Sequence, residues 1–341
     1  MTETHMHEEV LEIPDAARRI LASGQARAEA FARDYLARKP GLIATIGRGS
    51  SDHAAYFLKY AFEIELGVPV VSLGPSLASL YGVNPNLAGG VSIAISQSGK
   101  SPDIVALAKA VREAGALSIA LVNTVPSPLS ENSDHAIDLA AGPEKSVAAT
   151  KSYVNSVVAG LMLLAEIKND AALKSALAAL PDRLQAALAT DWMPLSDHLV
   201  GRKSMFVLGR GPTLAIANEA ALKMKETCSV HAEAYSAAEV LHGPVELVEP
   251  GFPVLVFNGG GQPEQATTAV ARDIAARGGA VFMTGASAEG VNMLPVADAG
   301  HPLTDALVQI ASYYIFVEAH ARRLGRNPDV PRQLKKVTET M

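Results

Sequence analysis

Hydroxyl side chains cluster in the segment ISQSGKSPD, which covers residues 95–103. Its Gly-Lys-Ser matches the end of a nucleotide-binding P-loop, but that motif needs a glycine where this chain has Ala94. The segment is instead predicted to connect a buried strand, residues 91–95, to a helix that begins at Pro102 and Asp103, two residue types that favour a first helical turn. Free N–H groups and the helix dipole attract anions, so the segment is predicted to bind a small phosphate and not ATP.

A second serine-bearing loop follows the apolar run at residues 41–47. Ser50 and Ser51 lie just beyond that run and open a helix-like segment. Ligands of open parallel sheets bind at the carboxyl ends of the strands, where both serine loops fall. The two loops are therefore predicted to converge on one phosphate. The alternative is that these serines only cap helices and satisfy turns, as serine commonly does.

The order of the apolar runs predicts the fold. Strand-like runs alternate with helix-like runs, as in an α/β protein whose parallel sheet carries helices on both faces. The second half repeats the first: residues 206–211 resemble 44–49, and residues 251–264 resemble 90–103, at spacings of 162 and 161 positions. The chain is thus predicted to contain a duplicated domain, of which only the first copy keeps the row of serines.

Length and composition exclude several classes of protein. The 341 residues allow two ordinary domains, and a net charge of -6 disfavours binding to nucleic acid. Cys228 is the only cysteine, which excludes an internal disulfide and a cysteine-rich metal site. No apolar run is long enough to span a membrane, and the polar N-terminus is unlike a secretory signal. We therefore expect a soluble, cytoplasmic protein without nucleic-acid or membrane partners.

A second group of charged side chains lies in a strong helix-forming pattern at residues 218–226. Glu219, Lys223 and Glu226 share one face of that predicted helix. The alternative for such a pattern is a solvated face of salt bridges, which is its commoner role.

Two later segments also carry ionisable side chains. Residues 231–244 contain two histidines and two glutamates, namely His231, Glu233, Glu239 and His242. Their spacing matches neither of the usual helical zinc motifs, so no metal is predicted. The tail at residues 328–341 keeps apolar residues beside Lys335 and Lys336 and is expected to dock on the protein, with a frayed basic end as the alternative.

Five motifs together resemble one family. GRGSSDHA, SQSGKSPD, GPEKSVAATKS, ALKMKETCSVHAEAYSAAEVLHGP and PRQLKKVTET are similar to segments of the sugar-isomerase (SIS) domain proteins, specifically the isomerase half of glucosamine-6-phosphate synthase and its stand-alone deaminase relatives. The likeness covers nearly the whole chain. It implies two tandem SIS domains, each a doubly wound, Rossmann-like sheet of five parallel strands flanked by helices, in a homodimer without a cofactor.

This resemblance also implies an organisation of the chain. An N-terminal helical segment (1–35) would precede SIS domain 1 (36–175), which binds the phosphate. A helical linker (176–198) would lead to SIS domain 2 (199–328), which carries the catalytic helix, and an active-site tail (329–341) would follow.

The family's functional residues carry over by motif. The resemblance assigns the sugar phosphate to Ser51, Ser96, Gln97, Ser98 and Ser101. It makes Glu226 the base that moves a proton between C1 and C2, with Lys223 beside it. It assigns ring opening to His242, supplied by the partner subunit. Lys336 would contact the open-chain sugar and can form a Schiff base, and Val147 would line the sugar pocket.

Two departures from the synthase shape the expected function. Too few residues precede the first SIS domain for a glutamine-hydrolysing domain, and Thr2 follows Met1 where the synthase has its cysteine nucleophile. Lys335 stands where the synthase has a small residue. The expected reaction is therefore deamination of glucosamine 6-phosphate to fructose 6-phosphate and ammonia. The alternatives are galactosamine 6-phosphate deamination, a fructosamine-6-phosphate deglycase, or a non-catalytic phosphosugar sensor.

Overall fold

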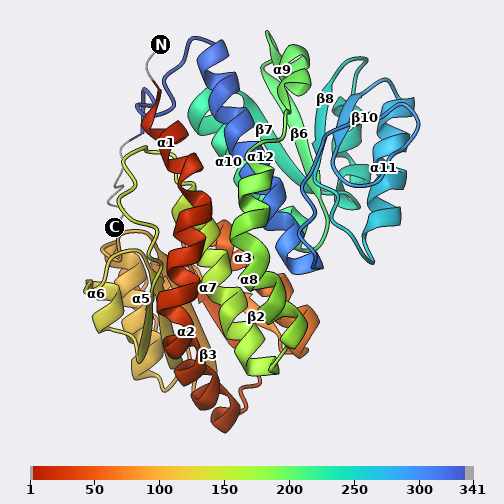
Figure 1. Ribbon diagram of the computed structural model, residues 1–341. Coiled ribbons are helices and arrows are strands. Elements are labelled where there is room, and N and C mark those ends of the chain that lie inside the picture. Colours follow the sequence, from red (N-terminus) through yellow and green to blue (C-terminus); the bar gives the residue numbers. More distant parts are fainter. Residues whose placement is uncertain (1–2, 335–341) are drawn as a thin grey trace. The chain divides into compact units, whose positions relative to one another are not determined.

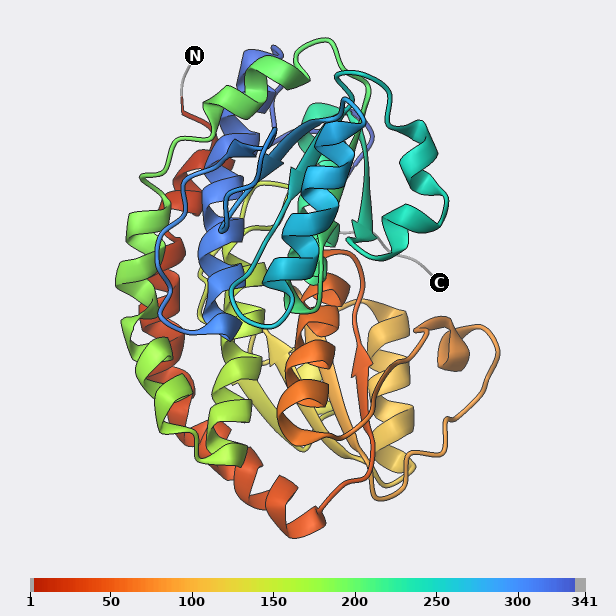
Figure 2. The same cartoon turned by 90° about the vertical axis from the view of Figure 1, so that its right-hand side faces the viewer.

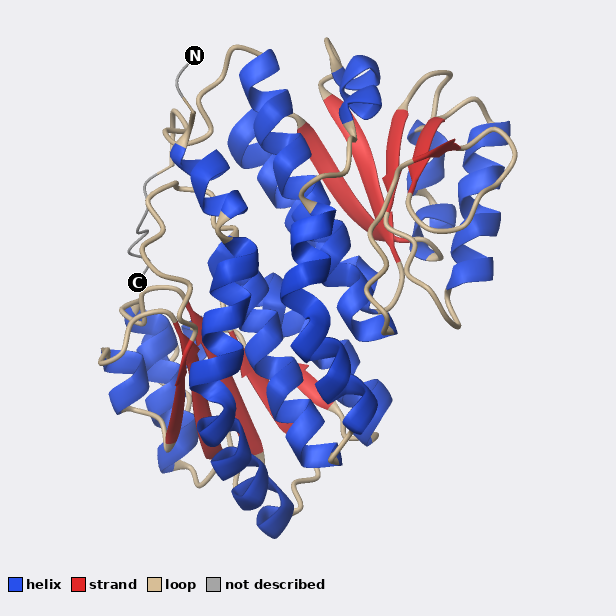
Figure 3. Cartoon of the chain, viewed as in Figure 1, coloured by secondary structure: helices blue, strands red, loops and turns tan. Residues whose placement is uncertain are grey.

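The computed structural model describes residues 3–334 and divides the chain into two compact units (Figure 1). The first unit contains Asp15–Glu144 and Lys151–Ala179, and the second contains the residues up to Pro14, Lys145–Thr150 and Leu180–Leu334. Two helices continue along the chain from one unit into the other, α2 (Ile13–Arg38) and α8 (Ala171–Ala187). Each unit is built around its own parallel sheet with helices beside it (Figure 3).

The first unit contains a five-stranded parallel sheet in the order β2-β1-β3-β4-β5. Its strands are β1 (Ile43–Ile46), β2 (Val70–Ser72), β3 (Val91–Ser96), β4 (Leu117–Val122) and β5 (His135–Asp138). Every residue of β3 and of β4 is buried, as expected for central strands covered on both faces. The remaining helices of this unit are α3 (Ser50–Leu66), α4 (Ser76–Ser79), α5 (Pro102–Glu113), α6 (Pro128–Glu131) and α7 (Lys151–Lys168).

One long connection in the first unit departs from the compact pattern. The chain between β2 and β3, which includes α4, extends away from the sheet (Figure 2). Leu80 and Tyr81 in this connection are exposed, at 62% and 74%. Other residues of the same connection do pack on the core: Leu87 is 5% exposed, and Leu77 and Ala78 of α4 lie against the buried cluster.

The second unit repeats the arrangement with different residues. Its sheet has the order β10-β9-β8-β6-β7, all parallel. The strands are β6 (Ser204–Gly209), β7 (His231–Ser236), β8 (Pro253–Val256), β9 (Ala280–Met283) and β10 (Asn292–Met293). The helices are α1 (His5–Leu11), α9 (Met193–Leu199), α10 (Pro212–Lys223), α11 (Glu264–Ala276) and α12 (Pro302–Arg323), with a π-helical turn at Met224–Cys228 and 3-10 turns at Glu239–His242 and Pro244–Leu247.

The two sheets confirm the predicted duplication. Starting from β2 and from β7, the strands follow the same order, with β1 matched by β6 and β3 by β8. Gly49 and Gly211 hold equivalent places, each just before a helix, with φ of 54° and 63°. Only glycine adopts such angles without steric cost, so the repeated Gly-Arg-Gly reflects a repeated turn.

A buried histidine packs against the aromatic core of the second unit. His320 on α12 is fully buried, and its Nδ1 lies 2.8 Å from Ser196 Oγ. Burial disfavours the charged ring, and the Arg323 guanidinium adds repulsion, so the pKa of His320 falls to about 4. The native state therefore keeps His320 neutral under conditions in which an exposed histidine would take up a proton.

We expect His320 to make folding sensitive to acid. Its folded pKa lies below the unfolded value of roughly 6.5, so its contribution is complete above that value and is lost as the pH falls towards 4. The expected loss is about 3 kcal/mol, measured by urea unfolding between pH 7 and pH 4. His320→Gln should have a shallower pH dependence, whereas His5→Gln, at a half-exposed side chain, should behave as the wild type. Equal slopes in all three proteins would contradict this account.

Candidate active site

The two serine loops of the first unit lie at the carboxyl ends of neighbouring strands. Strands β1 and β3 pair in parallel, with Ile43 opposite Val91. The loop after β1 leads into α3, whose first residues are Ser50 and Ser51, and the loop after β3 leads into α5. The sheet thus brings together the loops that hold the five predicted phosphate ligands, Ser51, Ser96, Gln97, Ser98 and Ser101.

The serine hydroxyls also shape their own loop. Ser96 Oγ accepts a hydrogen bond from the Gly99 N–H at 3.0 Å, and Ser98 Oγ accepts one from the Lys100 N–H at 3.3 Å. The turn-forming role is therefore real for these two serines. A hydroxyl that accepts from the backbone still has its own proton to donate, so the same geometry leaves both groups able to bind an anion.

The predicted catalytic helix carries a buried ion cluster in the second unit. The Lys223 ammonium lies 2.6 Å from the Glu226 carboxylate and 3.3 Å from the Glu219 carboxylate. Tyr314 donates a hydrogen bond to Glu219 Oε1 at 3.1 Å. Glu219 and Lys223 are 0% exposed, so a solvated face of salt bridges is the wrong interpretation for this pattern.

Charge compensation keeps Lys223 protonated in spite of its burial. Desolvation alone would lower its pKa, but the carboxylates of Glu219 and Glu226 outweigh that cost and hold the pKa above its usual value. Two negative charges face one positive charge, and the Tyr314 hydroxyl stabilises the deeper carboxylate.

The helix changes its winding just before Glu226. Regular α-helix ends at Lys223, and a π-helical turn covers Met224–Cys228. Such turns are rare and occur often at functional sites. Sequence patterns did not predict the π turn, because Met224, Lys225 and Glu226 are ordinary helix formers that continue the pattern of α10. Burial raises the pKa of the neighbouring Cys228 thiol to about 12, so that thiol stays protonated and is not a nucleophile.

Glu226 is the member of the cluster that reaches a cavity. A space of about 790 Å³ is bordered by residues from the π turn and from the segment after α12: Leu222, Lys225, Glu226, Thr227, Ser229, Gly325, Arg326, Asn327, Val330, Pro331, Arg332, Gln333 and Leu334. The Glu226 side chain is 17% exposed, whereas that of Lys223 is 1% exposed. A ligand in the cavity would therefore meet the glutamate and not the lysine.

The remaining predicted residues lie elsewhere. His242 is exposed on a 3-10 turn and does not border the Glu226 cavity of its own chain. Val147 is half-buried in the second unit, in a loop whose Ser146 N–H donates to the buried Glu9 carboxylate at 3.3 Å. Lys336 lies outside the described residues.

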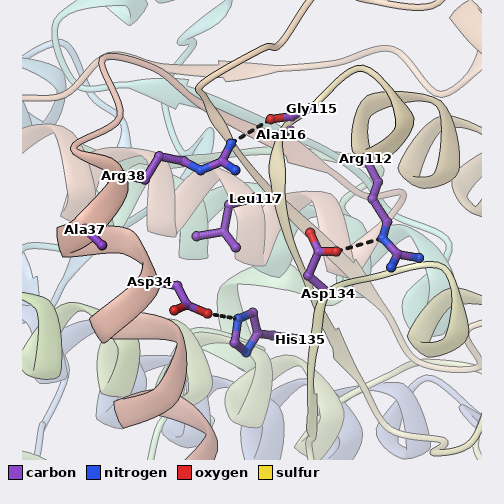
Figure 4. A pocket seen from close by; sticks show the side chains of 9 residues that line it. All are labelled: Asp34, Ala37, Arg38, Arg112, Gly115, Ala116, Leu117, Asp134 and His135. Carbon is purple, nitrogen blue, oxygen red and sulfur yellow. Dashed lines mark hydrogen bonds and ion pairs between the residues drawn. The ribbon is translucent and has the colours of Figure 1, made fainter.

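A second hollow, of about 830 Å³, lies at the amino-terminal ends of strands in the first sheet, opposite to the serine loops (Figure 4). It is bordered by Leu117 and His135, the first residues of β4 and β5. Its charged groups already have partners: His135 lies 2.8 Å from Asp34, and Arg112 donates to Asp134 at 2.8 Å. We assign no chemistry to this hollow.

Residues 3–334 contain no group of three or more His, Cys, Asp or Glu side chains that could hold a metal ion. No helix in the same range is long and apolar enough to cross a membrane.

Removing the buried ammonium should destabilise the protein strongly. Lys223→Met would leave two carboxylates, one of them fully buried, without their cation. Breaking a buried ion pair in this way costs roughly 3–5 kcal/mol, which urea unfolding can measure. Adding Glu219→Gln to Lys223→Met should restore part of the loss, and Lys225→Met, at an exposed neighbour, should be nearly neutral. A stable single Lys223→Met variant would count against the charge balance described above.

Comparison with known proteins places this fold and its loops in one family. The model of the SIS domain matches residues 36–166 and 198–287. The chain is similar to glutamine–fructose-6-phosphate aminotransferases (isomerizing), with 32% identity to that of Sulfurisphaera tokodaii over 305 residues and 34% to that of Pyrobaculum aerophilum over 352 residues. These alignments cover 86% and 97% of this chain but 49% and 56% of the relatives, so the chain spans about half their length.

Solved structures agree. A crystal structure of a candidate phosphosugar isomerase from Silicibacter pomeroyi DSS-3 is 49% identical, with a TM-score of 0.93 and coverage of 96% of this chain and 100% of that one. The C-terminal domain of glucosamine-fructose-6-phosphate aminotransferase from Francisella tularensis shares the fold at 23% identity and a TM-score of 0.84, covering 96% and 98%. The glucosamine-6-phosphate deaminase of Thermotoga maritima shares it at 19% and 0.72, covering 95% and 100%. The chain belongs to the SIS domain family and carries the domain twice.

Proposed function

We propose that the chain is a phosphosugar isomerase that deaminates glucosamine 6-phosphate, yielding fructose 6-phosphate and ammonia. The observation that carries this proposal is Glu226, whose carboxylate borders the cavity while Lys223 holds it from the buried side at 2.6 Å. An aldose-ketose isomerisation needs a carboxylate base beside the carbonyl carbon. The names of the relatives, which refer to fructose 6-phosphate and to isomerisation, support the substrate class.

The proposed reaction begins with phosphate binding and ring opening. The phosphate ligands are the five predicted residues of the serine loops, Ser51, Ser96, Gln97, Ser98 and Ser101. His242 assists proton transfer at the ring oxygen, for which an imidazole is suited. Val147 lines the sugar pocket, and Lys336 contacts the open-chain sugar.

The proton transfer itself needs one base. Glu226 removes the C2 proton of the open-chain aldehyde while O1 takes up a proton from water, which gives an enolamine. Glu226 then returns its proton to C1, which leaves a protonated ketimine at C2. Water adds at C2 and the nitrogen leaves as ammonia, while a proton equivalent to the one that O1 took up leaves with it as ammonium or passes to the solvent, which completes fructose 6-phosphate. Lys223 orients the base throughout, because its ammonium lies against the Glu226 carboxylate and is itself shielded from the cavity.

The first test is an assay for both products. Since the proposed reaction uses only the sugar phosphate and water, ammonia and fructose 6-phosphate should appear in equal amounts from glucosamine 6-phosphate without glutamine. Glu226→Gln keeps the side-chain volume but removes the base, so turnover should fall ~100-fold or more while the protein stays folded. Glu249→Gln, at an exposed glutamate of the same unit, is the matched control.

Other outcomes of that assay are informative. Turnover of galactosamine 6-phosphate or of a fructosamine 6-phosphate alone would move the proposal to that substrate. A sugar phosphate that raises the melting temperature without any turnover would replace the enzyme with a phosphosugar sensor.

We further propose that His242 acts in the active site of a partner subunit. Its exposure, its absence from the border of the Glu226 cavity, and the exposed Leu241 and Leu247 beside it, at 42% and 61%, support this arrangement. Apolar side chains so placed are suited to a protein interface.

Mixing two inactive variants tests the shared site. His242→Ala and Glu226→Gln proteins, unfolded and refolded together, should form mixed dimers that regain some activity, because one of the two sites then has both an intact glutamate and an intact histidine. Each variant refolded alone should stay inactive. Mixed dimers that form, as judged by differently sized tags, but show no activity would rule out the arrangement.

A further inference from the structure

Arg48 joins the two serine loops of the first unit. It lies in the loop after β1, two residues before Ser50, and its Nε donates to Asp103 Oδ2 at 2.6 Å. A second guanidinium nitrogen also contacts that oxygen. Asp103 lies in the first turn of α5, directly after the loop that contains Ser96 to Ser101. One ion pair therefore connects the two segments to which the phosphate is assigned.

The pair is asymmetric in burial. The Asp103 side chain is 1% exposed, and its other oxygen accepts the Ile104 N–H at 2.8 Å. The Arg48 side chain is 46% exposed. A guanidinium has five N–H donors, and Asp103 engages those of only two nitrogens, so donors remain for a ligand. Arg48 is thus held by a fixed carboxylate and keeps further N–H donors. An arginine in this situation is oriented for binding an anion.

The second unit offers an internal comparison. Arg210 occupies the place equivalent to Arg48, and Glu264 the place equivalent to Asp103. No ion pair joins these two residues among residues 3–334, yet Gly211 beside Arg210 has a φ of 63°, close to the 54° of Gly49. The turn therefore does not require the ion pair. The pair and the row of serines occur in the same copy, and both are missing from the other.

We propose that Arg48, oriented by Asp103, is the cationic ligand of the substrate's phosphate. This inference rests on the proposed function, because it uses the same two loops. Arg48 also neutralises Asp103, whose buried carboxylate would otherwise repel a phosphate dianion. Lys100, the lysine of the P-loop-like segment, is exposed, and no carboxylate among residues 3–334 orients it as Asp103 orients Arg48, so the proposal assigns the phosphate to Arg48.

Calorimetry with inorganic phosphate and with fructose 6-phosphate tests the proposal on the full-length protein. Arg48→Ala should weaken both ligands by roughly 10- to 100-fold, the usual effect of losing a charge-assisted contact. Arg210→Ala and Lys100→Ala remove the same charge from the equivalent turn and from the neighbouring loop, and both should bind as the wild type. Asp103→Asn should weaken binding less than Arg48→Ala, because the guanidinium is kept but no longer oriented.

The remaining outcomes separate binding from folding. If Arg48→Ala does not fold, Arg48→Lys is measured in its place. Lysine keeps the positive charge but lacks the planar guanidinium, so the affinity for both ligands should be lower than in the wild type and still measurable. Unchanged affinity in a folded Arg48 variant, or equal losses in the Arg210 or Lys100 controls, would overturn the proposal. A wild-type protein that binds neither ligand would overturn it as well.

The same experiment keeps this inference distinct from the proposed function. Fructose 6-phosphate binding that depends on Arg48, without ammonia release from glucosamine 6-phosphate, would support the phosphate ligand and reject the deaminase. Turnover that persists with unchanged affinity in Arg48→Ala would support the deaminase and reject the ligand.

Discussion

The candidate chemistry of the second unit depends on one buried cation. Lys223 is removed from water, and an ammonium in that position is tolerated only with carboxylates in contact with it. Glu219 meets that need from the same helix, one turn earlier, and Glu226 meets it from the π turn that follows. The second carboxylate contacts Lys223 and also borders the cavity, and it does so from a π-helical turn that replaces a regular continuation of α10. The orientation of the proposed base is thus a consequence of charge balance in the core.

The two units share their strand order and turns but carry different side chains at the carboxyl ends of the strands. Their strands follow one order, and the same glycine turn opens α3 and α10. Strand order and turn geometry are requirements of the fold, so both copies keep them. Side chains at the carboxyl ends of the strands differ between the copies, so the shared strand order does not depend on their identity. In the first unit these positions carry hydroxyls and the Arg48 ion pair, whereas in the second unit a phenylalanine, a glycine and a glutamine replace three of the serines: Phe257, Gly259 and Gln262.

Much of the fold could be predicted from the sequence because it follows from local patterns. Buried runs such as residues 91–96 are mainly apolar, and the repeat at a nearly constant spacing is visible without a structure. The serine loops were predictable for the same reason, since each directly follows such a run. The burial of Lys223 was not, because charges three and four residues apart are equally typical of a solvated helix. Contacts between distant residues, such as Arg48 with Asp103 or Tyr314 with Glu219, leave no local pattern at all.

Each unit contains a basic side chain paired with a carboxylate, but the two cations differ in their exposure to solvent. Lys223 is enclosed, so its positive charge serves its own carboxylates and it cannot act on a ligand directly. Arg48 forms its ion pair with Asp103 through two of its three nitrogens and remains nearly half exposed, so part of its hydrogen-bonding capacity stays available. Replacing a lysine by an arginine at position 223, or the reverse at position 48, would therefore not be conservative. The first site needs a compact charge between two carboxylates, and the second needs a planar fork that can hold a carboxylate and an anion together.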